Sequence, residues 1–379
     1  MDLINITEND YKYGFSTDIE TEVISKGLNE DIVRLISAKK NEPEWLLEFR
    51  LKAFRHWQKM KMPTWAHLNI PHIDYQNIAY YAAPRKNTPK SLDEVDPELL
   101  KTFEKLGIPL EEQKALSGVA IDAVMDSISV KTTFRETLAE KGIIFCSISE
   151  AVKDYPDLVK EYLGSVVPYA DNFFAALNSA VFSGGSFIYV PPNTKLDRPL
   201  QSYFRINSKN MGQFERTLII VDEGASLNYV EGCTAPKYSK DSLHAAVVEI
   251  YVKKGGYCRY STVQNWSNNI VNLVTKRAYV EENGHMEWID GNIGSMINMK
   301  YPACILAGEY AKGTTVSIAF ANEGQYQDTG AKMIHLAPHT TSQIISKSIC
   351  RGGGKVNYRG TVRHSSKAID AKSHVECDT

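Results

Sequence analysis

The chain has 379 residues, of which 43% are hydrophobic and 23% charged, and its formal net charge is −2. A chain of this length and composition can bury a large core, as ordinary globular proteins do. The near-neutral charge gives no indication of a nucleic acid or an anionic membrane as partner, and no apolar run reaches the length of a membrane helix. The first residues lack the pattern of a secretion signal or transit peptide, which predicts a cytoplasmic protein.

Residues 1–182 are predicted to form a mainly helical N-terminal region. Apolar residues recur at three- and four-residue steps from Leu46 to Met60, which predicts an amphipathic helix. We expect Asn41 to cap this helix and Pro63 to end it. Further helices are predicted over three segments: 96–107, around 149–163, and 168–181.

From Ser183 onward, short β-rich runs alternate with glycine turns. The runs include 187–190, 217–221 and 245–251, and the turns are 222–225, 253–256, 282–285 and 311–314. The turn glycines are spaced by 31 residues (224 to 255), 29 (255 to 284) and 29 (284 to 313). A near-constant period of strands and turns is typical of a β-solenoid, whereas a β-sandwich is the alternative that needs no period. The pattern therefore predicts a β-helix core over residues 183–379.

The six cysteines are widely separated, which excludes the local C-x-x-C motifs of zinc and redox sites. In a reducing cytosol we expect free thiols, most of them behaving as small buried hydrophobic residues. The cysteines are residues 146, 233, 258, 304, 350 and 377.

Two of the cysteines have surroundings that suggest chemistry. Cys233 lies between Gly232 and an Ala-Pro pair at the predicted end of a strand, which favours partial exposure and hence reactivity. A cysteine that only caps a turn is the other interpretation. Cys377 has His374 and two carboxylates as near neighbours, a set that can ligate iron or line a solvated turn.

Several enzyme motifs can be set aside. The glycines of 352–355 lack the spacing, the hydroxyl residue and the helix of a phosphate-binding loop, and are predicted to form a turn. His335 and His339 are separated by a proline in strand-like sequence, so they do not form a helical zinc pair. A carbohydrate-cleaving β-helix enzyme, which needs clustered carboxylates, is the remaining rival from another functional class.

Several motifs together resemble the SufB/SufD family, and within it the SufB type, the scaffold subunit of SUF iron–sulfur cluster assembly. The resemblance covers essentially the whole chain. It is carried by 65–71, 80–84, 231–236 (Glu-Gly-Cys-Thr-Ala-Pro), 243–249, 260–266, 275–277 and 332–336.

This resemblance implies a helical N-terminal region, a right-handed parallel β-helix and, in the family, a C-terminal helical domain. It implies a scaffold rather than an enzyme, working in a complex with SufD and the ATPase SufC. The sulfur donor would be the cysteine desulfurase SufS with SufE or SufU. The resemblance also implies a transient iron–sulfur cluster and reduced flavin in the intact complex.

The resemblance assigns roles to individual residues. The cysteine matching Cys233 accepts persulfide sulfur, and a passage inside the β-helix leads toward the cysteine matching Cys377, a proposed cluster ligand. Passage residues of the family match Arg205, Asn207, Thr262, Gln264, Trp266 and Lys276. The two basic residues would stabilise anionic sulfur and the others would supply hydrogen bonds, while thiolate formation at Cys233 would need electropositive surroundings.

Family members continue beyond the position of Cys377 with a histidine and glutamates that hold the cluster and with helices that bind SufC. We expect a chain that stops at Thr379 to hold a cluster or recruit SufC less well, and its last β-helix coil to be uncovered. A structural partner of the SufD type and a truncated, non-functional remnant are the alternatives to a working scaffold.

Overall fold

The computed structural model describes residues 21–66, 68–84, 120–125, 128–132, 138–196, 198–205, 212–234 and 242–379. Its helices are α2 (Glu30–Lys39), α3 (Glu44–Trp57), α7 (Ile148–Asp154), α8 (Pro156–Tyr162) and α9 (Phe173–Val181). Its early strands are β1 (Thr21–Val23), β2 (Ala82–Pro84), β3 (Ala120–Met125), β4 (Ile128–Thr132) and β5 (Ile144–Ser147).

Sixteen further strands follow, from β6 to β21, and form most of the remaining chain. They are β6 (Ser186–Val190), β7 (Leu200–Arg205), β8 (Arg216–Val221), β9 (Ser226–Thr234), β10 (Ser242–His244), β11 (Val247–Val252), β12 (Tyr257–Trp266), β13 (Ile270–Val280), β14 (His285–Gly294), β15 (Ile297–Lys300), β16 (Ala303–Leu306), β17 (Lys312–Ala321), β18 (Tyr326–His335), β19 (Thr341–Cys350), β20 (Lys355–His364) and β21 (Lys372–Asp378).

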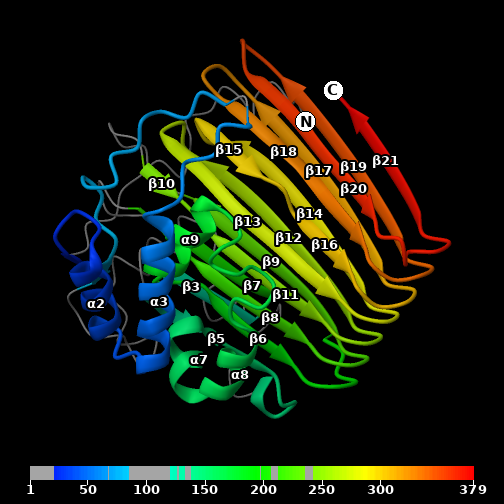
Figure 1. Cartoon of the computed structure of the whole chain (residues 1–379), viewed down its shortest axis with the longest axis horizontal. Helices are drawn as coiled ribbons and strands as arrows, with labels where there is room; N and C mark the ends of the chain where they lie inside the picture. The colour runs from blue at the N-terminus through cyan, green and yellow to red at the C-terminus, as the bar shows by residue number, and fades with distance from the viewer. Residues whose placement is uncertain are drawn as a thin grey trace.

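These strands wind into a parallel β-solenoid with two long sheets, and successive coils follow one another from green to red in Figure 1. One sheet has the order β4-β3-β7-β9-β12-β14-β17-β19-β21. The other runs β5-β6-β8-β11-β13 and continues through β15, β16, β18 and β20. From β6 onward all strand pairs are parallel. The predicted solenoid is therefore confirmed and the sandwich is excluded.

One edge of the solenoid repeats the same turn on every coil. The turn residue has a positive φ each time, and in the turns before Asp370 its amide donates to a carbonyl of the next coil over 2.7–3.3 Å. The turn residues are Asn193, Gly224, Gly255, Asn283, Tyr310, His339 and Asp370.

The predicted turn at 282–285 is confirmed, with Asn283 rather than Gly284 as its turn residue, whereas the turn predicted at 311–314 is wrong. Gly284 follows the left-handed Asn283, and Gly313 lies inside β17, while the turn itself is centred on Tyr310. Asparagine tolerates the left-handed region, and Tyr310 adopts it in a turn whose amide donates to Pro338 of the next coil. The glycine spacing therefore predicted the right period, although not every glycine was the turn residue.

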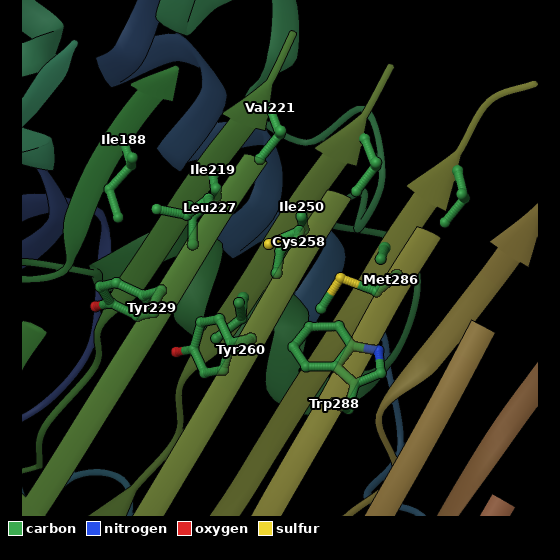
Figure 2. Packing of buried hydrophobic residues seen from close by; sticks show 14 of the residues in the cluster. Ile188, Ile219, Val221, Leu227, Tyr229, Ile250, Cys258, Tyr260, Met286 and Trp288 are labelled. Carbon is green, nitrogen blue, oxygen red and sulfur yellow. The ribbon is translucent and has the colours of Figure 1, made fainter. Parts of the chain in front are cut away.

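Half of the solenoid interior is packed with apolar side chains. Figure 2 shows its successive rungs, in which Tyr229, Tyr260 and Trp288 lie in register on β9, β12 and β14. Their ring centroids are 4.9 and 5.3 Å apart, distances at which tilted aromatic pairs attract each other. The facing sheet contributes Ile219, Ile250 and other aliphatic residues.

The helices of the N-terminal region lie against the outside of the early coils (Figure 1). Helix α9 packs between α3 and β13 and is buried along its whole length. Asn172 caps it with hydrogen bonds of 3.0 Å to two amides, as expected for an N-cap. No helix in the described ranges is long and apolar enough to cross a lipid bilayer.

The predicted helix boundaries need correction. Asn41 is not the cap of α3, because its φ of 51° places it in the left-handed link that follows α2. The N-cap is Pro43, which makes no side-chain hydrogen bond, and the helix ends at Trp57, well before Pro63. Helix α2 was not predicted, the segment 149–163 forms two helices, and the helix expected over 96–107 lies outside the described residues.

Candidate functional site

The other half of the solenoid interior is polar, although it is built on the same strands. Along β9 the inward positions change from Leu227 and Tyr229 to Glu231 and Cys233. Along β12 the inward positions change from Cys258 and Tyr260 to Thr262 and Gln264. Burying this many polar groups is costly unless they pair with one another, so their partners define the site.

Cys233 lies at the centre of this polar half. Its side chain is 2% exposed and contacts Phe204, Trp266 and Ile270. The thiol donates a hydrogen bond to Glu231 Oε1 at 3.7 Å, and the second oxygen of Glu231 accepts one from the hydroxyl of Tyr260. The partial exposure predicted for Cys233 is therefore wrong: β9 carries the residue into the interior before the strand ends.

Burial and nearby carboxylates disfavour the thiolate form of Cys233. Burial, together with the charges of Glu231 and Glu215, raises the pKa of Cys233 well above its ordinary value, while Lys276 and Lys300 act in the opposite direction. The electropositive surroundings expected from the sequence are thus present, but carboxylates and burial outweigh them. The group that could accept the thiol proton is Glu231, to which the thiol is hydrogen-bonded.

Two buried lysines share one carboxylate beside this thiol. Nζ of Lys276 and Nζ of Lys300 each lie 3.2 Å from Asp290 Oδ1, and all three side chains are buried. Lys276 also donates to the hydroxyl of Thr262, and Lys300 donates to Gln264 Oε1 at 3.2 Å. Burial, partly offset by Asp290, lowers the pKa of Lys300 to about 8. The cluster therefore holds a surplus of positive charge when both lysines are protonated.

A ladder of amide side chains runs along the facing sheet. Asn272 donates to Gln264 at 3.1 Å and to Asn298 at 2.6 Å, and Asn298 donates to Gln327 at 2.8 Å. The ladder begins at His244, whose Nδ1 lies 2.5 Å from Asn272 Oδ1. Each coil adds one rung, because these residues are in register across β10, β13, β15 and β18.

His244 and Glu215 form a buried acid–base pair in this site. Its Nε2 lies 2.5 Å from Glu215 Oε2, and its ring centroid is 4.8 Å from that of Trp266. Burial alone would lower the pKa of His244, but the charge and hydrogen bond of Glu215 raise it above the ordinary value. Both residues line a cavity of about 10 Å³ beside Cys233, close to the smallest space that holds one water molecule.

The structure brings four of the six predicted passage residues together around Cys233. Thr262, Gln264, Trp266 and Lys276 are all buried in the polar half of the interior. The backbone of Arg205 lies opposite Thr234 at the end of β7, and its side chain is outside the described set. Asn207 also lies outside the described residues.

A column of inward-facing residues connects this site to Cys377. Successive strands place one residue each at the same register position, from β9 through β12, β14, β17 and β19 to β21. All members before Cys377 are polar and buried. They are Glu231, Thr262, Asp290, Ser317 and Ser346.

The near neighbours of Cys377 do not converge on its thiol. Side chains alternate along β21, so His374, Glu376 and Asp378 lie on the face opposite to exposed Cys377. Both carboxylates are instead paired with Lys347. Within the described ranges, no three His, Cys, Asp or Glu side chains are grouped so as to hold a metal ion.

Comparison with known proteins identifies the family. A profile described as "SUF system FeS cluster assembly, SufBD core domain" matches residues 204–379, and "SufBD protein N-terminal region" matches residues 34–202. An iron–sulfur cluster assembly SufBD family protein of Staphylococcus haemolyticus is 59% identical over 371 residues, covering 98% of this chain and 79% of the relative. The SufBD family proteins of Staphylococcus epidermidis and Staphylococcus aureus match over the same shares at 59% and 58% identity. The chain belongs to the SufBD family.

Membership of the SufBD family supports a role in iron–sulfur assembly, with other components of the SUF system as partners. Several polar residues of this SufBD chain were not singled out from the sequence, among them Glu231, Asp290 and Lys300. The signal that could have found them is alternation: Glu-Gly-Cys at 231–233 and Asp-Gly-Asn at 290–292 put polar side chains on the inward face. Their grouping depends on the register between coils.

Proposed function

We propose that this chain is a SufB-type scaffold that accepts sulfur at Cys233 and directs it along the solenoid interior toward Cys377. The observation that carries the proposal is the register column from Glu231 to Cys377, which provides a continuous polar path from the thiol pocket to an exposed thiol. A scaffold that only supported its partners would not need such a path, because buried polar groups destabilise a core unless they are paired.

The accepting step is a thiol exchange. Glu231 takes the proton of Cys233, to which it is already hydrogen-bonded, and the resulting thiolate attacks the outer sulfur of a cysteine persulfide on the donor. The donor's sulfur–sulfur bond breaks, a new one forms at Cys233, and the donor cysteine leaves as a thiolate. No oxidant or reductant is consumed, because the transferred sulfur keeps its oxidation state.

The polar half of the interior can then stabilise anionic sulfur. Lys276 and Lys300 share one carboxylate, so their combined charge is not neutralised by Asp290. Among the described residues, the buried Nε1–H of Trp266 has no acceptor, and an unpaired buried donor is costly. An anionic sulfur near Cys233 would supply that acceptor.

The further partners follow from the same proposal. The sulfur donor is a cysteine desulfurase system, SufS with SufE or SufU, and the complex includes SufD and the ATPase SufC. The iron–sulfur cluster is the cargo, with Cys377 as one thiolate ligand. The reduced flavin expected for the intact complex stays a prediction.

Mass spectrometry tests the proposal directly. The purified chain is incubated with SufS, SufE or SufU, and cysteine, and the persulfide is located by peptide mapping. We expect it on Cys233, lost in Cys233→Ser and retained in Cys258→Ser, which removes a buried thiol from the apolar half. An equal amount of persulfide in Cys233→Ser, or labelling only elsewhere, would contradict the proposal. No labelling at all would favour the SufD-like role.

A further inference from the structure

A second and larger cavity lies on the outside of the solenoid, between its outer face and the N-terminal elements. Its volume is about 460 Å³, within the range of small-molecule sites. Leu273, Thr275 and Arg277 of β13 line it from one side, and Phe173 and Phe174 of α9 from another. Met60, Lys61, Pro63 and Trp65 of the N-terminal region, together with Met299, Tyr301 and Lys332, also line it.

Aromatic rings dominate the wall of this cavity near Tyr301. The centroid of Trp65 lies 5.6 Å from that of Tyr301, with the rings tilted by 48°. Trp65 is nevertheless 51% exposed, which is high for a tryptophan that contacts other rings. A planar molecule placed here would cover the exposed part of Trp65 and stack against aromatic surface.

The charged lining of the cavity is predominantly basic. It contains Lys61, Lys276, Arg277 and Lys332 but one carboxylate, that of Asp171. Arg277 already binds Asp171 through two contacts of 2.5 and 3.1 Å. These two charges neutralise each other, and the ammonium group of Lys276 is paired with Asp290 in the interior. The positive charge of Lys61 and Lys332 is therefore available to a ligand.

Lys332 is the basic residue best placed to meet a ligand. Its Nζ lies 5.6 Å from the centroid of the Tyr301 ring, and it makes no ion pair with any described carboxylate. Burial, and then the charge of Arg277, lower the pKa of Lys332, while Asp171 opposes this. A bound anion would stabilise the ammonium group in this half-buried position.

The N-terminus of α9 adds to the positive potential of the cavity. Asn172, its N-cap, also donates to the hydroxyl of Thr275 at 3.1 Å, and both residues line the cavity. The helix has nine residues, and the amide end of a helix favours negative charge within its first turn. This supports the lysine but would not define a site alone.

From the aromatic wall and the unpaired Lys332 together, we propose that this cavity binds a planar aromatic anion. Its ring lies against Trp65 and Tyr301, and its carboxylate, sulfonate or phosphate group pairs with Lys332. Lys276 also borders this cavity, but its ammonium group is directed into the interior, where it contacts Thr262 and Asp290. Thr275 and Arg277 lie on the outer face of β13, so the ligand would lie on the opposite side of this strand from the sulfur path. The proposal therefore stands or falls independently of sulfur transfer.

Two dyes of similar shape and different charge test this proposal. Fluorescence titration with anilinonaphthalene sulfonate should show saturable binding at one site. In Lys332→Met we expect affinity for the sulfonate to fall about tenfold, while affinity for neutral phenylnaphthylamine stays unchanged. Trp65→Ala should weaken binding of both dyes. Lys254→Met, which removes an exposed turn lysine paired with Glu282, should change neither.

A competition experiment on the unmodified chain guards against misfolding of the variants. Benzoate should displace the bound sulfonate, whereas benzyl alcohol at equal concentration should not. Sulfonate binding that is non-saturable, unaffected by Lys332→Met in a folded variant, or displaced equally by the alcohol would overturn the proposal.

Discussion

The two halves of the solenoid interior share strands, register and alternation, yet differ in chemistry. On β12, Cys258 and Tyr260 face aliphatic and aromatic neighbours, while Thr262 and Gln264, the next two inward residues, face lysines and amides. The apolar half gains free energy directly from burial. The polar half must first offset the desolvation of its charges. Stability and chemistry are therefore separated along each strand, with the Tyr260–Glu231 hydrogen bond at the boundary.

The apolar half should carry the larger share of stability. Replacing Trp288, which is fully buried and packs against the tilted ring of Tyr260, with alanine should lower the free energy of unfolding by about 3–5 kcal/mol. The exposed Ile318 provides the control, since Ile318→Ala should change stability by less than about 0.5 kcal/mol. Urea denaturation followed by circular dichroism measures both. Equal effects would show that the interior packing is not the source of stability.

The polar half should carry the chemistry. Glu231→Gln keeps the size of the side chain but cannot take the proton of Cys233, so the rate of persulfide transfer should fall about a hundredfold. In Glu231→Gln the alkylation rate of Cys233 should no longer depend on Glu231 as a base. The rate should instead rise with pH as the thiol itself ionises. Glu287→Gln, on the outer face of β14 beside Arg259, is the matched control and should leave transfer unchanged. A normal transfer rate in Glu231→Gln would exclude this base.

The free-energy cost of burying a charged residue in the polar half can be measured at Lys300, from the pH dependence of folding stability. Its pKa is about 8 in the folded chain and about 10.4 in an unfolded one, so the unfolded state binds the proton more tightly between these values. Lys300 therefore destabilises the fold below pH 8, and this penalty disappears as the pH rises toward 10. The stability of the wild type relative to Lys300→Met should increase by about 2 kcal/mol from pH 7 to 10. If the difference in stability between the wild type and Lys300→Met did not change with pH, the lowered pKa of Lys300 would be wrong.

The smallest expected effect is a difference in thiol reactivity. Cys350 and Cys377 are exposed, whereas Cys233 and Cys258 are buried in the polar and apolar halves. With iodoacetamide at neutral pH, the two exposed thiols should be alkylated at least about tenfold faster than either buried thiol. Peptide mapping over time gives the four rates. Rapid alkylation of Cys233 would show that its pocket opens readily.

The fold was largely predictable because its signal is periodic. The turn spacing indicated coils, and β6, β8 and β11 lie close to where β-rich runs were expected. The fourth turn was misplaced because a tyrosine, Tyr310, adopts the conformation normally given to glycine. Helix α3 was found, but its start was misassigned to Asn41, whose side chain suits both a cap and a left-handed link.

The site was predictable only in part, because its residues are brought together by the pairing register between strands of different coils. The resemblance to a family led to Thr262, Gln264, Trp266 and Lys276, which are buried in the same half of the interior as Cys233; their role in sulfur passage stays a prediction. Local sequence around Cys233 suggested an exposed strand end and missed the carboxylate two residues earlier. Asp290 lies beside Thr262 through the pairing of β14 with β12, and Lys300 reaches Asp290 from β15 in the facing sheet. No local sequence pattern shows either placement.

The register column also sets a length. Cys377 lies five strand steps from Glu231, because β12, β14, β17 and β19 intervene between β9 and β21. Neighbouring strands are about 4.8 Å apart, so the two thiols are separated by roughly 24 Å, whereas a sulfur–sulfur bond spans about 2 Å. Cys233 and Cys377 therefore cannot form a disulfide with each other or pass sulfur by direct contact. The distance between Cys233 and Cys377 is set by the number of coils between them. Adding or removing one coil would change this distance by one interstrand spacing.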